Sequence, residues 1–390
     1  MLLVVSSRWP HPYLRSEQGL GVALAVAGCA AMTGAFAAGP APARLASEQD
    51  WPPFVLVAGL LLVGLVADGD GVFAAAGREV ARMARSGIVL FAGAVVLIGV
   101  VTATLNLDTS VAFLTPVLVY TARSRGSGQA PLLYGVLLLS NAGSLLLPGS
   151  NLTNLIVLGH LHLSGARFLA RMWLPWLAAL AVTAAVVGVA ERRSLRGEAG
   201  ELAPRQRPEL GLGLVAVAAA TVLVVVLRAS AIPVAAVGAV AAGVRLAQRR
   251  HGLRDVAHIL GLPVLIGLFG IAVALGTLGR SWAGPADLLG HLGTWATAAV
   301  AAVTAVLVNN LPAASLLAAR TPTHPFALLV GLNLGPNLFV TGSLAWVLWL
   351  RAARATGSRP SVARASRLGA LAVPLSMAAA LGALVLTGGR

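Results

Sequence analysis

Residues 145–159 read LLLPGSNLTNLIVLG, an apolar stretch with helix breakers and amides at its centre. Pro148 and Gly149 would interrupt a helix here, and Asn151 and Asn154 follow within about one turn. Inside a membrane, irregular backbone is tolerated only where it faces protein or a wet cavity. The stretch therefore predicts an interrupted helix that lines an internal polar site.

The composition predicts an all-α polytopic membrane protein. The 390 residues are 58% hydrophobic and only 11% charged, and the mean hydropathy is +0.86. About ten apolar runs recur along the chain, and roughly 20 apolar residues span the ~30 Å hydrocarbon core. A soluble protein of this length would need a far more charged surface.

The net charge of +15 comes from arginine alone, because the chain has no lysine. The arginines lie in short loops between apolar runs, so they indicate membrane topology rather than a nucleic-acid partner. We predict spans at 20–39, 52–67, 131–160, 172–190, 210–227, 231–246, 257–278, 326–350 and 368–388.

Residues 86–122 and 292–320 each hold two apolar arms around a polar centre, and we predict them to be re-entrant hairpins. We predict a multi-pass protein of the cell inner (plasma) membrane with its N-terminus in the cytoplasm. With both hairpins re-entrant, this orientation leaves only seven of the 28 arginines on the outer side. Treating either hairpin as a simple span destroys this positive-inside bias. The seven outer arginines are Arg44, Arg167, Arg171, Arg228, Arg280, Arg320 and Arg390.

The same placement predicts two inverted repeats. Residues 1–190 hold the first repeat, with hairpin 86–122 and broken helix 131–160. Residues 231–390 hold the second, with hairpin 292–320 and broken helix 326–350, and residues 191–230 supply a cytoplasmic linker and a connecting helix. Inverted repeats with broken helices are typical of secondary transporters, which bind substrate near the bilayer midplane.

The N-terminal apolar run allows a second interpretation, because AFAAG at 35–39 resembles a signal-peptide cleavage site. We expect a retained helix, since the repeat needs it. The single cysteine, Cys29, excludes a disulfide framework or a site of several thiolates from one chain.

Four polar islands, at residues 105–116, 148–154, 309–315 and 333–343, are predicted to converge on one substrate site. Each combines amides or hydroxyls with a helix interruption, so half-helices would direct their positive N-terminal ends at a shared point. Asparagine, serine and threonine supply donors and acceptors without the desolvation cost of a charge. The substrate-binding candidates are Asn106, Thr109, Ser150, Asn151, Thr153, Asn154, Asn309, Asn310, Asn333, Asn337, Thr341 and Ser343.

Asp108 is the one acid of 13 that we place deep in an apolar segment. Intramembrane carboxylates are rare and mostly functional. Burial favours the neutral acid, whereas the N-terminus of the following half-helix favours the carboxylate. We therefore predict that Asp108 carries the coupling proton.

The sequence disfavours an intramembrane enzyme. It contains no H-E-x-x-H, no G-x-S-x-G and no Walker loop, and no nucleophile stands with a visible base. We predict no catalytic residue, no cofactor and no metal ligand. The alternatives within transport are a sodium/proton antiporter and a small-anion transporter.

The islands resemble the arsenical pump membrane protein family of the ion transporter superfamily. The matching stretches are LNLDTSVAFLTPVLV (105–119), SNAGSLLLPGSNLTNLI (140–156), VNNLPA (308–313) and NLGPNLFVTGSLAWVLWL (333–350). The superfamily also holds sodium/proton antiporters of the NhaD type and dicarboxylate transporters.

The resemblance implies export of arsenite and antimonite, driven by protons or by a cytoplasmic ATPase subunit. Asp108 falls on the family's hairpin-tip acid, and Asn309 and Asn310 fall on its paired asparagines. Some relatives carry an acid where this chain has Asn333, which leaves the coupling stoichiometry open. The expected partners are the lipid bilayer, a metalloid and protons, with the ATPase subunit and a homodimer left open.

Overall fold

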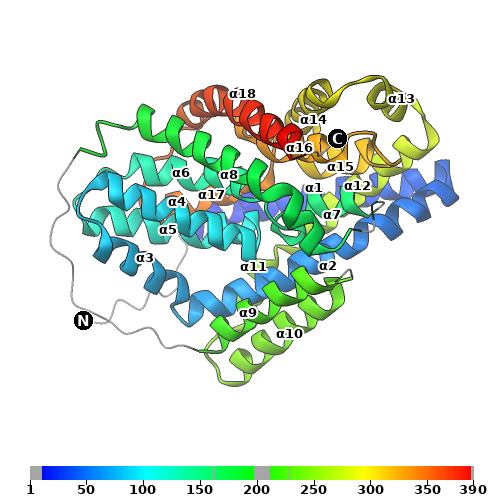
Figure 1. Cartoon of the computed structure of the whole chain (residues 1–390). Coiled ribbons are helices and arrows are strands. Elements are labelled where there is room, and N and C mark those ends of the chain that lie inside the picture. Colours follow the sequence, from blue (N-terminus) through cyan, green and yellow to red (C-terminus); the bar gives the residue numbers. More distant parts are fainter. Residues whose placement is uncertain (1–10, 160, 162, 197–210, 228, 388–390) are drawn as a thin grey trace.

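The computed structural model describes residues 11–159, 161, 163–196, 211–227 and 229–387 (Figure 1). Within these ranges every element is helical, and six helices are long and apolar enough to cross a membrane. The α-helices are α1(His11–Ala38), α2(Pro40–Gly69), α3(Val72–Met83), α4(Gly87–Thr104), α5(Leu107–Ser124), α6(Ala130–Gly143), α7(Leu152–Leu158), α8(Gly165–Ala190), α9(Leu212–Val226), α10(Ala231–Ala247), α11(Leu253–Leu260), α12(Leu262–Ser281), α13(Gly284–His291), α14(Thr294–Val308), α15(Asn310–Leu317), α16(Pro325–Leu334), α17(Leu344–Ala355) and α18(Val362–Leu386), with 3₁₀ turns η1(Pro148–Ser150) and η2(Gly335–Leu338).

The predicted all-α membrane fold is confirmed, but some boundaries were wrong. α2 begins at Pro40 and continues through Pro52 and Pro53, whereas we had begun this span at residue 52. The short helices α3 and α13 lie where no span was predicted, and the predicted span 257–278 begins inside α11 and so joins α11 to α12. Part of the predicted linker, residues 197–210 and 228, lies outside the described residues.

Both predicted helix interruptions are present. α6 ends at Gly143, and the chain passes through η1 before α7 begins at Leu152. α16 ends at Leu334, and η2 and an extended segment precede α17. In each case proline and glycine lie at the break, where a continued helix would lose hydrogen bonds.

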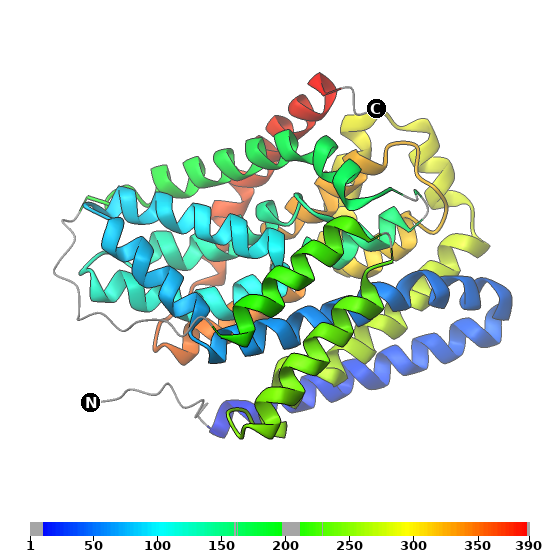
Figure 2. The ribbon, with the colours of Figure 1, turned by 60° about the horizontal axis from the view of Figure 1, so that its bottom comes forward.

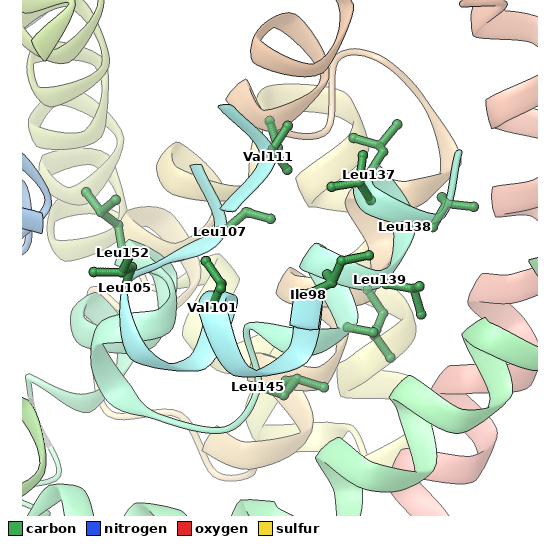
Figure 3. Packing of buried hydrophobic residues seen from close by; sticks show 14 of the residues in the cluster. Ile98, Val101, Leu105, Leu107, Val111, Leu137, Leu138, Leu139, Leu145 and Leu152 are labelled. Carbon is green, nitrogen blue, oxygen red and sulfur yellow. The ribbon is translucent and has the colours of Figure 1, made fainter. Parts of the chain in front are cut away.

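The two predicted hairpins are helix–turn–helix pairs. α4 turns into α5 at Leu105 and Asn106, and α14 turns into α15 at Asn309, whose φ of 76° is left-handed. Figure 3 shows buried leucines of α6 (Leu137, Leu138 and Leu139), of the first break (Leu145) and of α7 (Leu152), which belong to the same hydrophobic cluster as Leu105 and Leu107 at the first turn. That these pairs re-enter the membrane face from which they came remains a prediction.

The half-helices that begin at the hairpin turns and at the breaks, α5, α7, α15 and α17, pair across the two halves of the chain. α5 packs on α17, and α7 packs on α15 (Figure 1). Side chains tie each pair together at its C-terminal end. Arg123 donates to the carbonyl oxygen of Thr356 at 2.5 Å, while Gln49 Nε2 donates to the carbonyl oxygens of Ile156 (2.9 Å) and Ala318 (3.2 Å).

Long helices surround this centre and approach one another very closely. α1 packs along α12, and a Cβ added at Gly28 would lie 2.2 Å from the carbonyl oxygen of Gly267. Small residues allow such backbone contact between membrane helices. Figure 2 shows α9 and α10 crossing the long α2. A buried ion pair joins Asp70, at the end of α2, to Arg245 on α10.

Membrane sidedness of the first hairpin gives a direct test. In a Cys29→Ser background, Arg85→Cys and Ser124→Cys place exposed thiols just before α4 and at the end of α5. If the hairpin is re-entrant, an impermeant maleimide labels both in everted vesicles and neither in intact cells. Arg44→Cys, exposed near the start of α2, should show the opposite pattern. Labelling of positions 85 and 124 from opposite faces would contradict the hairpin and the inverted repeat.

Candidate functional site

The first hairpin tip contacts the first helix break. The hydroxyls of Ser110 on α5 and Ser140 on α6 lie 3.2 Å apart. Ser150 Oγ donates to the carbonyl oxygen of Ala103 at 3.1 Å. The turn of the hairpin is therefore fixed against the irregular backbone between α6 and α7.

The second hairpin tip contacts the second break in a comparable way. The backbone N–H of Asn310 donates to the carbonyl oxygen of Gly342 at 2.9 Å, and Asn309 Nδ2 donates to that of Thr341 at 3.3 Å. Thr341 Oγ1 donates to the carbonyl oxygen of Val306 at 2.5 Å. The second tip is partly exposed, because Thr341 and the neighbouring Phe339 lie at the surface.

Asn333 on α16 joins the two breaks. Its Oδ1 accepts hydrogen bonds from Ser144 Oγ (2.6 Å) and Asn151 Nδ2 (2.8 Å). Its Nδ2 donates to Asn154 Oδ1 (2.9 Å) and to the carbonyl oxygen of Leu329 (2.8 Å). The side-chain amide thus uses its full hydrogen-bonding capacity within the protein.

A further pair of amides, Asn141 and Asn337, also joins the first half of the chain to the second. Asn141 Nδ2 donates to Asn337 Oδ1 at 2.9 Å, and Asn337 Nδ2 donates to the carbonyl oxygen of Leu138 at 3.0 Å. Together these bonds connect all four predicted islands: the first tip to the first break, the first break to the second, and the second break to the second tip.

Asparagines also cap the half-helices. Asn106 Oδ1 accepts from the backbone N–H of Thr109 at 2.6 Å, which caps α5. Asn151 caps α7 through Thr153 N–H at 3.3 Å, and Asn309 caps α15 through Leu311 N–H, also at 3.3 Å. Each capped end carries the positive end of a helix dipole and binds negative or electron-rich groups well.

Several buried polar atoms at these helix starts have no hydrogen-bond partner in the protein: Asn106 Nδ2, Thr109 Oγ1, Thr153 Oγ1 and Ser343 Oγ. An unmade bond on a buried polar group costs roughly 1–3 kcal/mol. The predicted residues therefore fall into two sets. One set, centred on Asn333, holds the protein together, and the other has polar atoms free to bond to water or a small polar solute.

Asp108 lies in the first turn of α5 and is partly exposed. Among the described residues none forms a hydrogen bond or an ion pair with its carboxylate. Its neighbour Thr109 contacts α2, where a Cβ added at Gly64 would lie 2.5 Å from the Thr109 methyl group. The carboxylate is thus close to the unpartnered groups of Asn106 and Thr109 in sequence and belongs to the same helix start.

The sequence reasoning missed some of the site. Ser140, Asn141 and Ser144 were not among the candidates, although three polar residues within an apolar run were a usable signal. It also missed Asp50, which we had placed at a span end and which the structure buries inside α2. The prolines at 52 and 53 disguised the continuation of the helix.

Comparison with known proteins identifies relatives. The profile of a family described as citrate transporter, CitMHS, matches residues 18–350. Two arsenical pump membrane proteins of Escherichia coli are 27% and 25% identical to this chain over 335 residues, which are 77% of this chain and 78% of each relative.

A solved structure has the same overall fold. It is the YdaH transporter of Alcanivorax borkumensis, whose crystal structure is described as revealing an unusual topology. The TM-score is 0.50 at 16% sequence identity, and the match covers 92% of this chain and 86% of that one. At this identity the likeness concerns the fold alone.

The saturated amide of Asn333 predicts a stability defect. Asn333→Ala removes the partner of Ser144, Asn151 and Asn154, and hydrogen bonds between membrane helices contribute about 0.6–2 kcal/mol each. We expect the free energy of unfolding in detergent to fall by about 2–4 kcal/mol.

Ser376→Ala is the matched control, because this buried hydroxyl bonds only to a carbonyl of its own helix. It should change the unfolding free energy by less than about 1 kcal/mol. Equal effects of the two substitutions, measured by denaturant unfolding, would refute the joining role of Asn333.

Proposed function

The chain belongs to the citrate transporter family CitMHS. We propose that it is a secondary transporter that exports arsenite and antimonite in exchange for protons, as its likeness to arsenical pump membrane proteins supports. The family and the relatives are transporters rather than enzymes. We further propose that it lies in the plasma membrane with its N-terminus in the cytoplasm, as the arginine distribution predicts.

The observation that carries the proposal is the set of unpartnered amide and hydroxyl atoms at the starts of α5, α7 and α17. Arsenite at neutral pH is an uncharged trihydroxide, which needs several neutral donors and acceptors rather than a counter-charge. The arsenical pump proteins that resemble this chain support the same substrate.

The charge of the islands argues against a citrate-like substrate. No arginine, lysine or histidine occurs in 105–116, 148–154, 309–315 or 333–343, and the first of these carries Asp108. A polycarboxylate would have only helix ends as counter-charge and would meet a carboxylate in the same site. A sodium ion remains the alternative substrate, because a carboxylate and backbone carbonyls suit it.

A transporter of a metalloid must also release it. Thiolates bind trivalent arsenic too tightly for rapid turnover, and the one cysteine, Cys29, is exposed on α1 rather than among the islands. Reversible hydrogen bonds at the capped helix starts suit release. The proton gradient supplies the energy in this scheme, so it requires no ATPase subunit.

The crossed pairing of half-helices supports alternating access. α5 with α17, and α7 with α15, each combine a hairpin arm of one half of the chain with a broken helix of the other. Inverted repeats produce this exchange when their central elements interdigitate. Movement of one pair relative to the other would expose the shared helix starts to one side at a time.

Substrate identity is tested in an arsenite-sensitive bacterium. Expression should raise tolerance to arsenite and antimonite and lower cellular arsenic, and it should leave arsenate handling unchanged where no reductase is present. Everted vesicles should accumulate radiolabelled arsenite, but not citrate, when acidified inside. Accumulation of citrate, or sodium-dependent proton movement without arsenite transport, would replace this proposal by one of the alternatives.

Asp108→Asn tests the coupling. The amide keeps the shape of the side chain and fixes it in a neutral form, so arsenite exchange across the membrane should continue while proton-driven accumulation falls at least tenfold. Asp108→Glu should retain partial accumulation. Exchange of labelled for unlabelled arsenite, measured beside accumulation in the same everted vesicles, separates the two activities. Normal accumulation by Asp108→Asn would show that another group carries the proton.

A further inference from the structure

A buried acid without a hydrogen-bond partner lies outside the four islands. Asp50, in the N-terminal third of α2, is only 1% exposed. Both of its carboxylate oxygens are buried and lack a hydrogen-bond partner. Buried carboxylates are ordinarily paired or hydrogen-bonded, and an ionisable residue within a membrane helix is a candidate functional group.

Two polar side chains face Asp50 without bonding to it. The Ser315 hydroxyl, from α15, lies close enough to interact with the carboxyl but is directed to the carbonyl oxygen of Leu311 at a long 3.4 Å. The Arg280 guanidinium, from α12, acts on Asp50 electrostatically, while its hydrogen bonds go to the Gly276 carbonyl oxygen (3.0 Å) and to Gln49 Oε1.

The remaining charged groups nearby are engaged elsewhere. Arg320, which follows α15, donates to the carbonyl oxygen of Arg280 at 3.0 Å. Arg44 and Glu48, earlier on α2, form an exposed ion pair of 3.0 Å. The positive charge of Arg280 opposes any cation bound to the carboxylate, protons included, whereas burial without a hydrogen-bond partner favours the protonated, neutral acid.

Asp50 lies far from the centre of the proposed site. Gly64 of α2 is packed against Thr109 beside Asp108, and 14 residues separate Asp50 from Gly64. At 1.5 Å per residue, this places Asp50 about 21 Å along the helix, toward the end at which α7 and α15 finish. Gln49 donates to the carbonyl oxygens of Ile156, in the last turn of α7, and of Ala318, which follows α15, so Asp50 lies next to the C-terminal ends of both helices.

We propose that Asp50 is a second proton-binding site. It exchanges protons on the side of the membrane where α7 and α15 end, and its protonation state affects the second hairpin through Ser315. This inference rests on the proposed proton antiport. Only an O–H bond forms or breaks, and water delivers and accepts the proton.

The packing supplies the route of transmission. Deprotonated Asp50 attracts Arg280 and can accept the Ser315 hydroxyl, whereas protonated Asp50 releases Ser315 to Leu311. Ser315 lies five residues after Asn310, whose backbone N–H bonds to Gly342 in the second break. A change at one end of the short α15 therefore reaches the central helix starts directly.

The test compares Asp50→Asn with Asp287→Asn, an exposed acid on the neighbouring α13. Arsenite accumulation driven by a pH gradient in everted vesicles should fall at least tenfold for Asp50→Asn, with arsenite exchange within twofold of wild type. Asp287→Asn should match wild type in both. Wild-type accumulation by Asp50→Asn, or an equal loss of accumulation and exchange, would overturn the proposal.

A substrate-free measurement separates this inference from the proposed function. Difference infrared spectra of the purified protein between acidic and neutral pH should show a carboxylic-acid band that is lost in Asp50→Asn and retained in both Asp287→Asn and Asp108→Asn. If wild type moves no arsenite yet shows this band, the substrate assignment fails and the proton site stands. Absence of the band from wild type overturns the inference.

Ser315→Ala covers the case in which Asp50→Asn does not fold. It leaves the carboxyl in place, so the infrared band should remain while coupled accumulation falls at least threefold. Unchanged accumulation in Ser315→Ala would overturn transmission through this residue.

Discussion

The structure depends on one constraint: a helix that ends inside hydrocarbon must have its free backbone groups satisfied by the protein. Four half-helices begin in the middle of this chain, at Leu107, Leu152, Asn310 and Leu344. Asparagine side chains cap three of these starts, and the breaks and hairpin turns bond to one another. The caps are local, whereas the bonds between the hairpin turns and the breaks join segments that are far apart in the chain.

This assembly separates rigidity from recognition. Asn333 has no bonding capacity left, so it can hold α16 against the first break but cannot bind a solute without giving up a protein partner. The groups of Thr109, Thr153 and Ser343 lack partners, and they lie on half-helices that different elements position. These groups therefore have hydrogen-bonding capacity available for water or a small neutral solute.

The sequence was informative where a local pattern has one physical meaning. Proline and glycine within apolar runs located both interruptions, whereas the re-entrance inferred from the arginine distribution stays a prediction. It was misleading at Pro52 and Pro53, which normally begin a helix but here lie inside one, so the burial of Asp50 was missed. No local pattern could reveal the bonds of Asn333 to Ser144, Asn151 and Asn154, because roughly 180 residues of chain separate the partners and only tertiary packing pairs them.

The close contact between α1 and α12 has a consequence for biosynthesis. The first helix packs chiefly against a helix that lies more than 200 residues later in the chain. At about 5–20 residues per second, the ribosome makes that partner some tens of seconds after the first helix is inserted. During this interval the glycine-lined face of α1 contacts lipid alone, so its own hydrophobicity must keep it in the bilayer. Its long apolar run, little buried even in the finished protein, meets that requirement.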